Sequence, residues 1–458
     1  MALRGQNGQS YQLDIKPFNT GGEGDIYNIA GQEKIVAKVY HPGRATAEME
    51  KKLSVMIRKP PNSSVISQVA WPLELLYDDT GAFCGFVMPR LDVTDELSAV
   101  YPYPSKASVE QRLIVAENVC VVISEVHKAG YVFGDFNPNN IGVNMQTGNV
   151  AFFDTDTYHI FDPVSKVTYR CRAGYPGYVA PELLKRCEGY QDAYEQAPLP
   201  TFTQETDLFA LAIHIFKLLM NGFSPYNGIK EQDNISTPMP GTGDLPVKRD
   251  DYCFKPGNKP RAVAVPPLIT LPDEVAALFT QAFMEGRTNP EKRPTSVEWY
   301  HALKRYENVL VVCGKNKKHQ YKQGLSLCPW CEADVRYDAQ INSIKQSTFR
   351  GPIAPPPAPP RPHAAVPSVG YQNTRKTARS ATGAASGSAQ SQPSRSRAPR
   401  SGTVFKGILY GIGAYFACTL ICMVLLPTRL NNQLTLSGTL ELIRVGCAIV
   451  GFIVGFRV

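Results

Sequence analysis

One segment of the sequence limits where a folded core can form. Residues 336–402 are rich in Pro, Ser, Ala and Arg, and they contain the run IAPPPAPPRP at 353–362. A segment of this composition buries too little apolar surface to offset the entropy that it loses on ordering. We therefore predict a disordered linker with local polyproline II structure. Residues 1–335, which precede it, are long enough to form a sizeable core.

The charge of the chain is divided at the same place. The whole sequence contains 48 Lys and Arg and 40 Asp and Glu, a formal net charge of +8. Residues 339–402 carry nine basic residues and no acidic one, and residues 403–458 carry four basic residues and one acidic residue. The C-terminal part is therefore +12, and residues 1–338 are −4. This balance excludes a basic globular domain and argues against nucleic acid as a partner.

Strongly apolar sequence follows the linker. Residues 407–426 (GILYGIGAYFACTLICMVLL) form a stretch of twenty residues without a charge. At 1.5 Å per residue, a helix of this length spans about 30 Å, the thickness of a bilayer core. Residues 440–456 are also apolar, but Glu441 and Arg444 lie near one end, close enough on a helix to pair. We predict two transmembrane helices within residues 403–458; the alternatives are a buried soluble helix for the first and an interfacial helix for the second.

The basic linker predicts the orientation of these helices. Basic residues before the first span favour the cytoplasmic side, where anionic lipid would attract them. The N-terminus has no apolar signal segment, so we expect the C-terminal pair to direct the protein to the inner membrane. Singly scattered cysteines in residues 1–308 agree with a reducing compartment. Residues 1–335 are thus expected to face the cytoplasm.

A glycine-rich turn lies near the N-terminus. Residues 18–27 (FNTGGEGDIY) place Gly21, Gly22 and Gly24 between two predicted strands. Glycines allow backbone N–H groups to approach phosphate oxygens where a Cβ atom would clash. Taken alone, a glycine turn in an ordinary hairpin is the commoner explanation.

A single lysine interrupts the apolar strand that follows. Residues 35–40 (IVAKVY) contain Lys38, whose charge is costly to bury unless it is paired. A helix predicted over residues 46–57 offers Glu48 and Glu50 as partners. The alternative is that Lys38 belongs to an edge strand.

Two groups of polar residues follow apolar segments. Helical spacing predicts a buried helix over residues 109–129, which leads into YVFGDFNPNNIGV at 131–143. The next apolar strand, 150–153, ends at Asp154 and Asp156. The first loop contains three candidate site residues: Asp135, Asn137 and Asn140. Such groups suggest a site that binds a metal and activates a nucleophile, although Asp and Asn also favour simple turns.

The order of these segments resembles the signature set of protein kinases. Three further segments match it: GYPGYVAPE at 174–182, ETDLFALAI at 205–213 and EKRPT at 291–295. The resemblance implies that Arg293 pairs with Glu182 of the Ala-Pro-Glu motif. The catalytic loop and GYPGYVAPE are particularly similar to a bacterial kinase family that is often fused to a helix-hairpin-helix DNA-binding domain. No such C-terminal signature occurs in this sequence, where the apolar segments take its place.

The resemblance also implies roles for individual residues in binding Mg²⁺-ATP. Lys38 would hold the α- and β-phosphates and pair with Glu50. Asp135 would orient the acceptor hydroxyl and take its proton, with Asn137 donating a hydrogen bond to the γ-phosphate. Asn140 and Asp154 would bind Mg²⁺. The nucleotide would also contact residues of the glycine loop and the hinge: Gly21, Gly22, Gly24, Ile26 and Met88.

The sequence departs from the kinase pattern at five places. Asn19 replaces the first glycine of the loop, a mild change because Asn tolerates a positive φ. Phe133 and Gly134 replace the usual His-Arg, which removes the arginine that pairs with a phosphorylated activation segment. Asn137 stands in place of a lysine, and Tyr175 in place of a threonine. The Asp-Phe-Gly motif reads Asp-Thr-Asp at 154–156, so a second carboxylate lies near the expected metal.

Two functions remain open at this point. The resemblance implies a bilobal α+β kinase fold over residues 1–308 and a Ser/Thr-type protein kinase whose protein substrate the sequence does not identify. The departures at Asn137 and Tyr175 favour the alternative, an ATP-binding pseudokinase that acts as a membrane-tethered signalling scaffold.

A short cysteine-rich segment, residues 309–335, follows the kinase-like region. Cys313, His319, Cys328 and Cys331 have the spacing C-x5-H-x8-C-x2-C. Three thiolates and one imidazole suit tetrahedral Zn²⁺. Because protein groups fill all four positions, we predict a closed structural site in a zinc-ribbon-like module. A redox-active Cys-x-x-Cys pair is the alternative.

Overall fold

The computed structural model describes residues 1–186, 201–233 and 243–348. By its contacts the chain divides into two units, Met1–Pro356 and Pro357–Val458, and only the first contains described residues. Both predicted transmembrane segments and residues 349–402 of the predicted linker lie outside the described residues. Within the part that is described, no helix is long and apolar enough to cross a bilayer.

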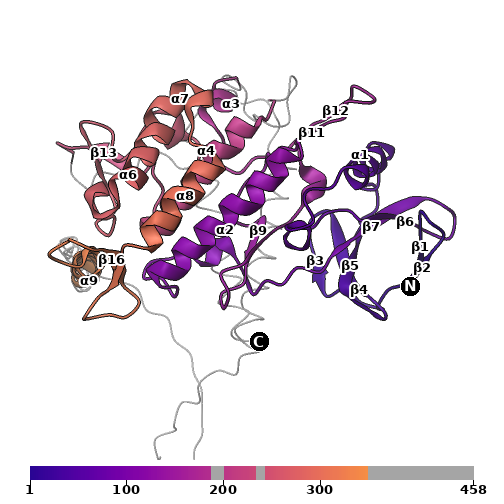
Figure 1. Cartoon of the computed structure of the whole chain (residues 1–458), viewed down its shortest axis with the longest axis horizontal. Helices are drawn as coiled ribbons and strands as arrows, with labels where there is room; N and C mark the ends of the chain where they lie inside the picture. Colours follow the sequence, from indigo (N-terminus) through magenta and orange to yellow (C-terminus); the bar gives the residue numbers. More distant parts are fainter. Residues whose placement is uncertain (187–200, 234–242, 349–458) are drawn as a thin grey trace, which may run out of the picture. The chain divides into compact units, whose positions relative to one another are not determined.

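A curled antiparallel sheet of seven strands forms the N-terminal lobe (Figure 1), in the order β2-β1-β6-β7-β5-β4-β3. Its strands are β1 (Ala2–Gly5), β2 (Ser10–Gln12), β3 (Asn19–Thr20), β4 (Gly24–Ile29), β5 (Gln32–Tyr40), β6 (Glu74–Tyr77) and β7 (Phe83–Pro89). Strand β5 lies between β4 and β7, so Lys38 is not on an edge strand. Side chains alternate between the two faces of a strand, which places Val36, Lys38 and Tyr40 on one face. Ala37 packs into a separate core on the other face.

Helix α1 (Ala47–Arg58) packs beside this sheet. Its N-cap is Thr46, whose hydroxyl accepts a hydrogen bond from the Met49 N–H at 3.1 Å. Leu53 and Met56 are fully buried, and each such side chain contributes about 1.5–3 kcal/mol through removal from water. The observed helix begins and ends one residue later than the predicted range, 46–57.

Helices dominate the larger lobe. Helix α2 (Val109–Lys128) runs through it and packs against α4 and α8, and its N-terminus has a capping box between Ser108 and Gln111. The remaining helices of this lobe are α3 (Pro181–Arg186), α4 (Gln204–Leu219), α5 (Leu245–Lys248), α6 (Asp273–Thr280), α7 (Gly286–Thr288) and α8 (Ser296–Glu307). One turn of π-helix, Gln281–Glu285, joins α6 to α7.

The larger lobe also contains short strands, and the polar loops lie next to some of them. They are β8 (Asp95–Glu96), β9 (Ile141–Val143), β10 (Val150–Phe152), β11 (Ile160–Phe161), β12 (Thr168–Tyr169), β13 (Gly228–Lys230) and β14 (Asn258–Pro260). Strands β8, β9 and β10 form a small sheet. The first polar segment singled out in the sequence runs directly into β9, and the second follows β10. The mixed α/β architecture with its curled N-terminal sheet suggests a kinase-like lobe, as the resemblance implies.

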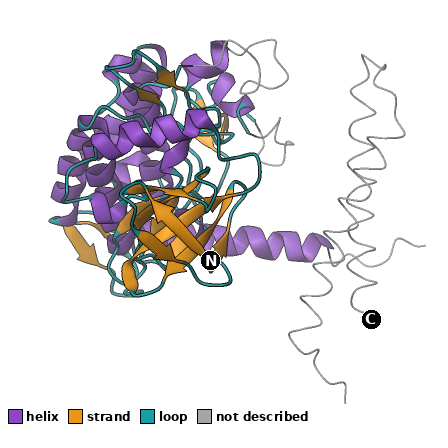
Figure 2. Cartoon of the chain, turned by 90° about the vertical axis from the view of Figure 1, so that its right-hand side faces the viewer, coloured by secondary structure: helices purple, strands orange, loops and turns teal. Residues whose placement is uncertain are grey.

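The cysteine-rich segment forms a hairpin and a helix. Strands β15 (Leu310–Val312) and β16 (Gln320–Lys322) pair antiparallel, and α9 (Pro329–Thr348) follows them. The segment joins the large lobe directly, because the Val109 N–H donates to the Lys318 carbonyl at 3.1 Å. In Figure 2, α9 is the helix that extends away from the two lobes.

The end of α9 corrects the predicted start of the linker. The helix continues to Thr348, so the first thirteen residues assigned to the linker, 336–348, are helical. The sequence explains this, because residues 336–350 contain neither Gly nor Pro, and the first such residues of the linker are Gly351 and Pro352. The proline-rich run itself lies outside the described residues.

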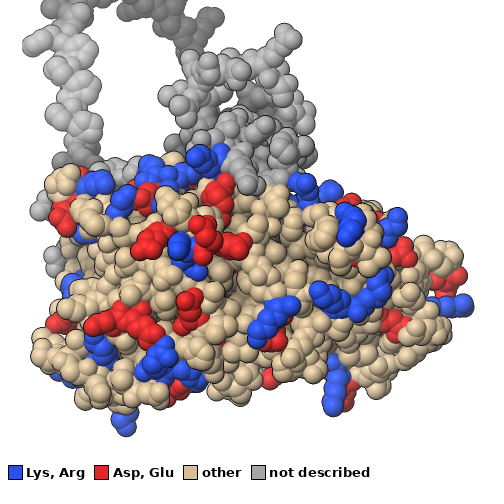
Figure 3. Space-filling view, turned by 45° about the horizontal axis from the view of Figure 1, so that its top comes forward, with Lys and Arg blue, Asp and Glu red and all other residues tan. Residues whose placement is uncertain are grey.

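Charged residues of both signs are interspersed on the face that Figure 3 shows. Basic and acidic side chains alternate over this face without a broad patch of one sign. The mixture agrees with the net charge of −4 for residues 1–338.

Candidate functional site

A cavity of about 450 Å³ lies between the N-terminal sheet and the polar loops. Residues from the glycine-rich turn, β5, the hinge and the Asp-Thr-Asp segment line it. Of the eight predicted nucleotide-binding residues, Asn140 is not among them and the other seven are: Gly21, Gly22, Gly24, Ile26, Lys38, Met88 and Asp154. A Cβ atom at Gly24 would lie 2.5 Å from the Val39 carbonyl oxygen, so this position requires glycine. The structure thus brings these seven residues to one cavity, whereas Asp135 and Asn137 are not among the residues that line it. The binding of a nucleotide stays a prediction.

Lys38 points into this cavity between two carboxylates. Its Nζ lies 2.8 Å from Asp156 Oδ2, 3.0 Å from Asp156 Oδ1 and 3.3 Å from Asp154 Oδ1. The residue is only 6% exposed. Burial alone would lower the pKa of Lys38, but the charges of Asp156 and Asp154 raise that pKa above its usual value. Lys38 is therefore held as a cation.

The predicted ion pair between Lys38 and Glu50 is wrong in this structure. Among the described residues, Lys38 pairs with the two aspartates, and Glu50 Oε1 accepts a hydrogen bond from Tyr77 Oη at 2.8 Å. The helix register explains the difference. Glu50 lies in the first turn of α1 and is half-buried, whereas Lys52 and Leu53 occupy buried positions of the helix.

Lys52 gives α1 a different link to the site. Its Nζ donates a hydrogen bond to the backbone oxygen of Asp156 at 2.6 Å, and the side chain is buried. Burial lowers the pKa of Lys52 to about 8. The helix therefore contacts the Asp-Thr-Asp segment through a lysine, where the kinase pattern expects a glutamate.

Asp156 is the main site residue that sequence reasoning did not assign. Its side chain is fully buried, and Oδ2 also accepts a hydrogen bond from Tyr40 Oη at 2.7 Å. Burial alone would raise the pKa of Asp156, but the Lys38 ammonium and the Tyr40 hydroxyl hold that pKa below its usual value. The sequence indicates part of this arrangement, because Lys38 and Tyr40 lie on one face of β5, where their polar groups need a partner if they are buried.

The backbone at Asp154 has an uncommon conformation. Asp154 has φ 48°, in the left-handed region that non-glycine residues seldom adopt, and such residues gather at functional sites. The short helix Thr155–Thr157 follows it, and Thr155 Oγ1 donates to the Ala70 carbonyl at 2.6 Å. Asp154 and Thr155 both line the cavity, and Thr155 is fully buried there.

Asp135 has one carboxylate oxygen engaged and one available. Oδ2 accepts a hydrogen bond from Asn140 Nδ2 at 3.2 Å, whereas Oδ1 is buried and, within the described residues, has no hydrogen-bond partner. Burial raises the pKa of Asp135, and hydrogen bonds from Asn137 and Asn140 oppose that rise. An unpaired, buried carboxylate oxygen is suited to accept a proton from a nearby hydroxyl.

Asn137 is turned towards the loop itself. Its Nδ2 donates to the Asp135 carbonyl at 3.3 Å, and its Oδ1 accepts from the Asn139 N–H at 2.9 Å. The side chain is 4% exposed. These contacts link Asn137 to the backbone of its own loop. Its predicted hydrogen bond to the γ-phosphate stays a prediction.

Asp207 of α4 fixes the start of the same loop. Its carboxylate accepts hydrogen bonds from the Phe133 N–H at 2.7 Å and the Gly134 N–H at 2.9 Å, and it contacts His127 Nε2 at 2.9 Å. Gly134 has φ 80°, and a Cβ atom there would lie 2.8 Å from Cys171 Sγ. Gly134 therefore allows the loop to pack closely against Cys171, and the arginine that kinases usually have at this position would not fit.

The predicted pair between Arg293 and Glu182 is confirmed. Arg293 Nη1 lies 2.8 Å from Glu182 Oε1, and Nη2 lies 2.7 Å from Oε2. This bidentate geometry is the strong form of an arginine–carboxylate contact, and Arg293 is 3% exposed. It ties α3 to the segment before α8.

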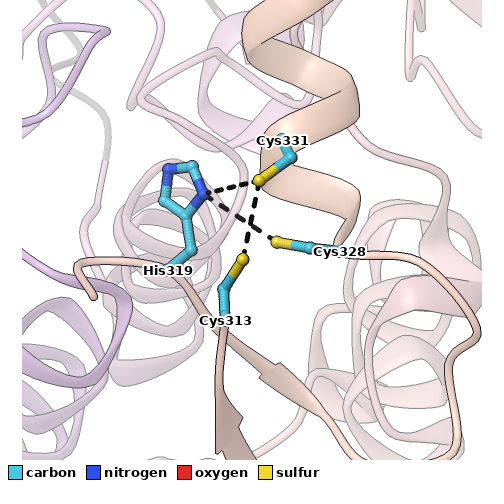
Figure 4. A group of neighbouring side chains, drawn as sticks. All are labelled: Cys313, His319, Cys328 and Cys331. Carbon is cyan, nitrogen blue, oxygen red and sulfur yellow. Dashed lines mark hydrogen bonds between the residues drawn. The ribbon is translucent and has the colours of Figure 1, made fainter. Parts of the chain in front are cut away.

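The four predicted metal ligands come together at the second candidate site (Figure 4). Their ligand atoms all lie within 4.8 Å of one another. Cys313 Sγ and Cys331 Sγ are 3.6 Å apart, and His319 Nδ1 lies 3.5 Å from Cys331 Sγ and 3.8 Å from Cys328 Sγ. Tetrahedral Zn²⁺ with ordinary bond lengths separates its ligands by about 3.5–3.8 Å. The residues thus fit zinc, and among the described residues these cysteines form no disulfide.

A second layer of contacts orients the histidine. With Nδ1 facing the sulfur atoms, Nε2 lies 3.4 Å from Asp334 Oδ2 on α9. The other oxygen of Asp334 accepts a hydrogen bond from Tyr103 Oη. A carboxylate behind a ligating histidine fixes its tautomer and raises its basicity. Sequence spacing alone did not reveal Asp334, which is brought into place by the first turns of α9.

Comparison with known proteins gives one consistent relationship. No protein-family model matches the chain. Two proteins named "Protein kinase YegI", from Escherichia coli strain K12 and from Escherichia coli O157:H7, are each 29% identical to it over 336 residues. The alignments cover 70% of this chain and 48% of each relative, so the chain spans about half the length of the relatives it matches. This homology supports a protein-kinase-like family for the chain.

Proposed function

We propose that this protein is a Ser/Thr-type protein kinase that uses Mg²⁺ and ATP to phosphorylate a protein hydroxyl. The observation that carries the proposal is that Lys38 and Asp154 line one cavity beside a glycine-rich turn, that Asp135 lies close enough to Asp154 for their charges to interact, and that Asn140 donates a hydrogen bond to Asp135. These four side chains supply the groups that phosphoryl transfer requires, which are a fixed cation, two metal ligands and a proton acceptor.

Each of these residues has a defined task in the proposed reaction. Lys38, held by Asp154 and Asp156, offers its ammonium to phosphate oxygens. Asn140 and Asp154 are the oxygen donors for Mg²⁺, which neutralises phosphate charge when bound. Asp135 Oδ1 orients the acceptor hydroxyl and accepts its proton, and burial keeps water away from that oxygen.

The experiment is transfer of labelled γ-phosphate from ATP to a general protein substrate by the full chain. Asp135→Ala should lower the transfer rate at least about 100-fold, the usual scale for loss of a general base. The matched control is Asp79→Ala, an exposed turn residue that should leave the rate unchanged. Equal transfer by the wild type and Asp135→Ala would overturn the proposal.

A pseudokinase is the second candidate. Asn137 is engaged with the loop backbone, and Tyr175 occupies the place of the threonine that usually pairs beside the acceptor. The same assay separates the two functions when Mg²⁺-ATP binding is measured alongside it. If the wild type and Asp135→Ala bind Mg²⁺-ATP but both transfer almost no phosphate, the protein is an ATP-binding scaffold.

We further propose that Cys313, His319, Cys328 and Cys331 hold a structural Zn²⁺. Four protein ligands leave no open position for a substrate, and so the metal would stabilise the fold. Metal analysis of the purified chain should give one zinc per molecule, reduced by Cys328→Ser and unchanged by Cys84→Ser. A zinc-free protein with a reversible Cys328–Cys331 disulfide would favour the redox alternative.

Residues 403–458 are proposed as the membrane anchor, with the basic linker against the anionic cytoplasmic surface of the inner membrane. The support is the length and apolarity of residues 407–426 and 440–456, together with the basic sequence before them. After cell fractionation, the full chain should stay with membranes in alkaline carbonate. A variant that lacks residues 403–458 should be released, and a full chain extracted by carbonate would contradict the anchor.

A further inference from the structure

We propose that a second cavity beside the catalytic loop binds an acidic side chain of the peptide substrate, through the ammonium of Lys217. The cavity has a volume of about 420 Å³. This inference deepens the proposed function, because it names a substrate class for the same site. It rests on the chemistry of the cavity walls and on their position next to the candidate active site.

Lys217 provides the charge. Its Nζ donates a hydrogen bond to Tyr178 Oη at 2.9 Å and lies 4.4 Å from the centre of the Tyr101 ring and 5.3 Å from that of Tyr178. These contacts leave part of the donor capacity of an ammonium unused. Burial lowers the pKa of Lys217 to about 8, so the side chain is still mostly protonated at neutral pH.

No carboxylate balances this cation within the described part of the chain. Lys217 forms no ion pair there, since its ammonium bonds to the Tyr178 hydroxyl. It is the one charged residue among the described residues that line the cavity. The other walls are aromatic or small and polar. A half-buried cation that has no carboxylate partner is costly to keep out of water, and a carboxylate that enters the cavity would relieve that cost.

The cavity adjoins the candidate active site. Asn139, in the loop between Asp135 and Asn140, lines both this cavity and the cleft that contains Lys38. Tyr175, at the position where kinases contact the acceptor segment, lines the cavity too. A peptide whose hydroxyl reaches Asp135 would therefore place a neighbouring side chain near Lys217.

The proposed occupant is thus a peptide with Asp or Glu close to the acceptor residue. The aromatic walls (Tyr101, Tyr103, Tyr178, Phe223 and Tyr337) would cover the apolar part of that side chain. Its carboxylate would form a charge-assisted hydrogen bond with Lys217, a contact about twice as strong as one between neutral groups. A basic side chain would meet the ammonium and be rejected.

Binding of labelled peptides tests this inference without any transfer step. Each peptide carries one serine and a single Glu at one of the three positions on either side, and a matched set carries Gln instead. Fluorescence anisotropy with the full chain in neutral detergent should find at least one Glu peptide that binds about tenfold more tightly than its Gln counterpart.

Variants of Lys217 separate recognition from a structural effect. Lys217→Gln should remove the preference, and Lys217→Glu should reverse it in favour of a peptide with Lys at the same position. The matched control is Lys51→Gln, an exposed lysine of α1, which should keep the preference. Equal binding of all Glu and Gln peptides, or a preference that survives in Lys217→Gln, would overturn the inference.

The two proposals fail in different ways. Acidic selectivity without phosphate transfer would keep the Lys217 site and remove the kinase activity, leaving a scaffold that docks acidic segments. Phosphate transfer that depends on Asp135 but shows no acidic selectivity would keep the kinase and remove this site.

Discussion

Lys38 and Asp156 form the central ion pair of the cleft, with Nζ 2.8 Å from Oδ2 and both side chains buried. Asp156 is two residues beyond Asp154, so a single short segment supplies both the carboxylate that positions the lysine and the proposed metal ligand. In the kinase pattern, the first of these carboxylates comes from a helix. Here the α1 helix supplies Lys52, which binds the backbone of the same segment.

Asp156→Asn should therefore impair the proposed reaction more than Glu50→Gln. Loss of the buried carboxylate leaves Lys38 without its main partner, and we expect kcat/KM for ATP to fall about 10- to 100-fold, or about 1.4–2.8 kcal/mol. Glu50→Gln should stay within about twofold of the wild type. ATP titrations of transfer, with thermal unfolding as a check on folding, measure both effects. A larger loss in Glu50→Gln would mean that the working enzyme uses the helix glutamate.

The pair of Arg293 and Glu182 should carry measurable stability. Arg293 is buried, and removing its partner leaves an unpaired buried charge, so Glu182→Gln should lower the free energy of unfolding by about 2–4 kcal/mol. Glu274→Gln removes a similar contact with Arg305 on the exposed surface, and it should cost less than about 0.5 kcal/mol. Urea unfolding of the two variants makes the comparison. Equal losses would show that burial does not set the strength of the first pair.

The buried histidine of α4 predicts a loss of stability in mild acid. His214 accepts from Tyr101 Oη at Nδ1 and donates to the Phe136 carbonyl from Nε2, and burial, with Lys217 nearby, lowers its pKa to about 3. The unfolded chain binds a proton at its ordinary pKa of about 6.5. Between these two values the unfolded state holds more protons, so stability falls as the pH falls.

The measurement is the free energy of unfolding at several values between pH 4 and pH 6.5. His214→Phe should lose a slope of up to about 1.4 kcal/mol per pH unit relative to the wild type. His301→Gln, an exposed control, should keep the wild-type slope. A slope unchanged in His214→Phe would assign the acid sensitivity to other groups, such as His159, whose burial lowers its pKa to about 4.

Local patterns were enough to predict much of this structure. Apolar spacing located α1 and α2, because a buried face repeats with the helical period. The spacing of Cys313, His319, Cys328 and Cys331 identified a cluster that the structure brings within metal-binding distance. The contact of Arg293 with Glu182 followed from the resemblance to kinases and was confirmed. In each case the signal lies within a segment or in a motif of fixed order.

The interactions that were missed join side chains far apart in the sequence. Asp156 is 118 residues from Lys38, and no local pattern tells which of several acidic residues a buried lysine will meet. Glu50 was chosen by helix position, but a rotation of the helix by half a turn is enough to exchange an inward glutamate for an inward Lys52. Asp334 likewise contacts His319 only because α9 packs next to the cysteine-rich hairpin.

A chain of side-chain contacts connects the metal site to the Lys217 cavity. His319 Nε2 lies 3.4 Å from Asp334, Asp334 accepts a hydrogen bond from Tyr103, and Tyr103 packs edge-on against Tyr337 with ring centres 5.0 Å apart. Both tyrosines line the cavity. Zinc bound at Nδ1 would fix the position of His319 and, through Asp334, that of the tyrosine wall.

Asp334→Asn should therefore weaken zinc binding about 10- to 100-fold, the usual effect of losing a carboxylate behind a ligating histidine. Asp338→Asn, one turn later on α9 and exposed, is the matched control and should keep the wild-type affinity. Competition with a chromogenic chelator measures both. Removal of zinc from the wild type should also lower the affinity for the acidic peptide several-fold, because the wall formed by Tyr103 and Tyr337 is no longer held. Unchanged peptide affinity in the zinc-free protein would separate the two sites, since a wall that needs no metal would be held by the packing of α9 alone.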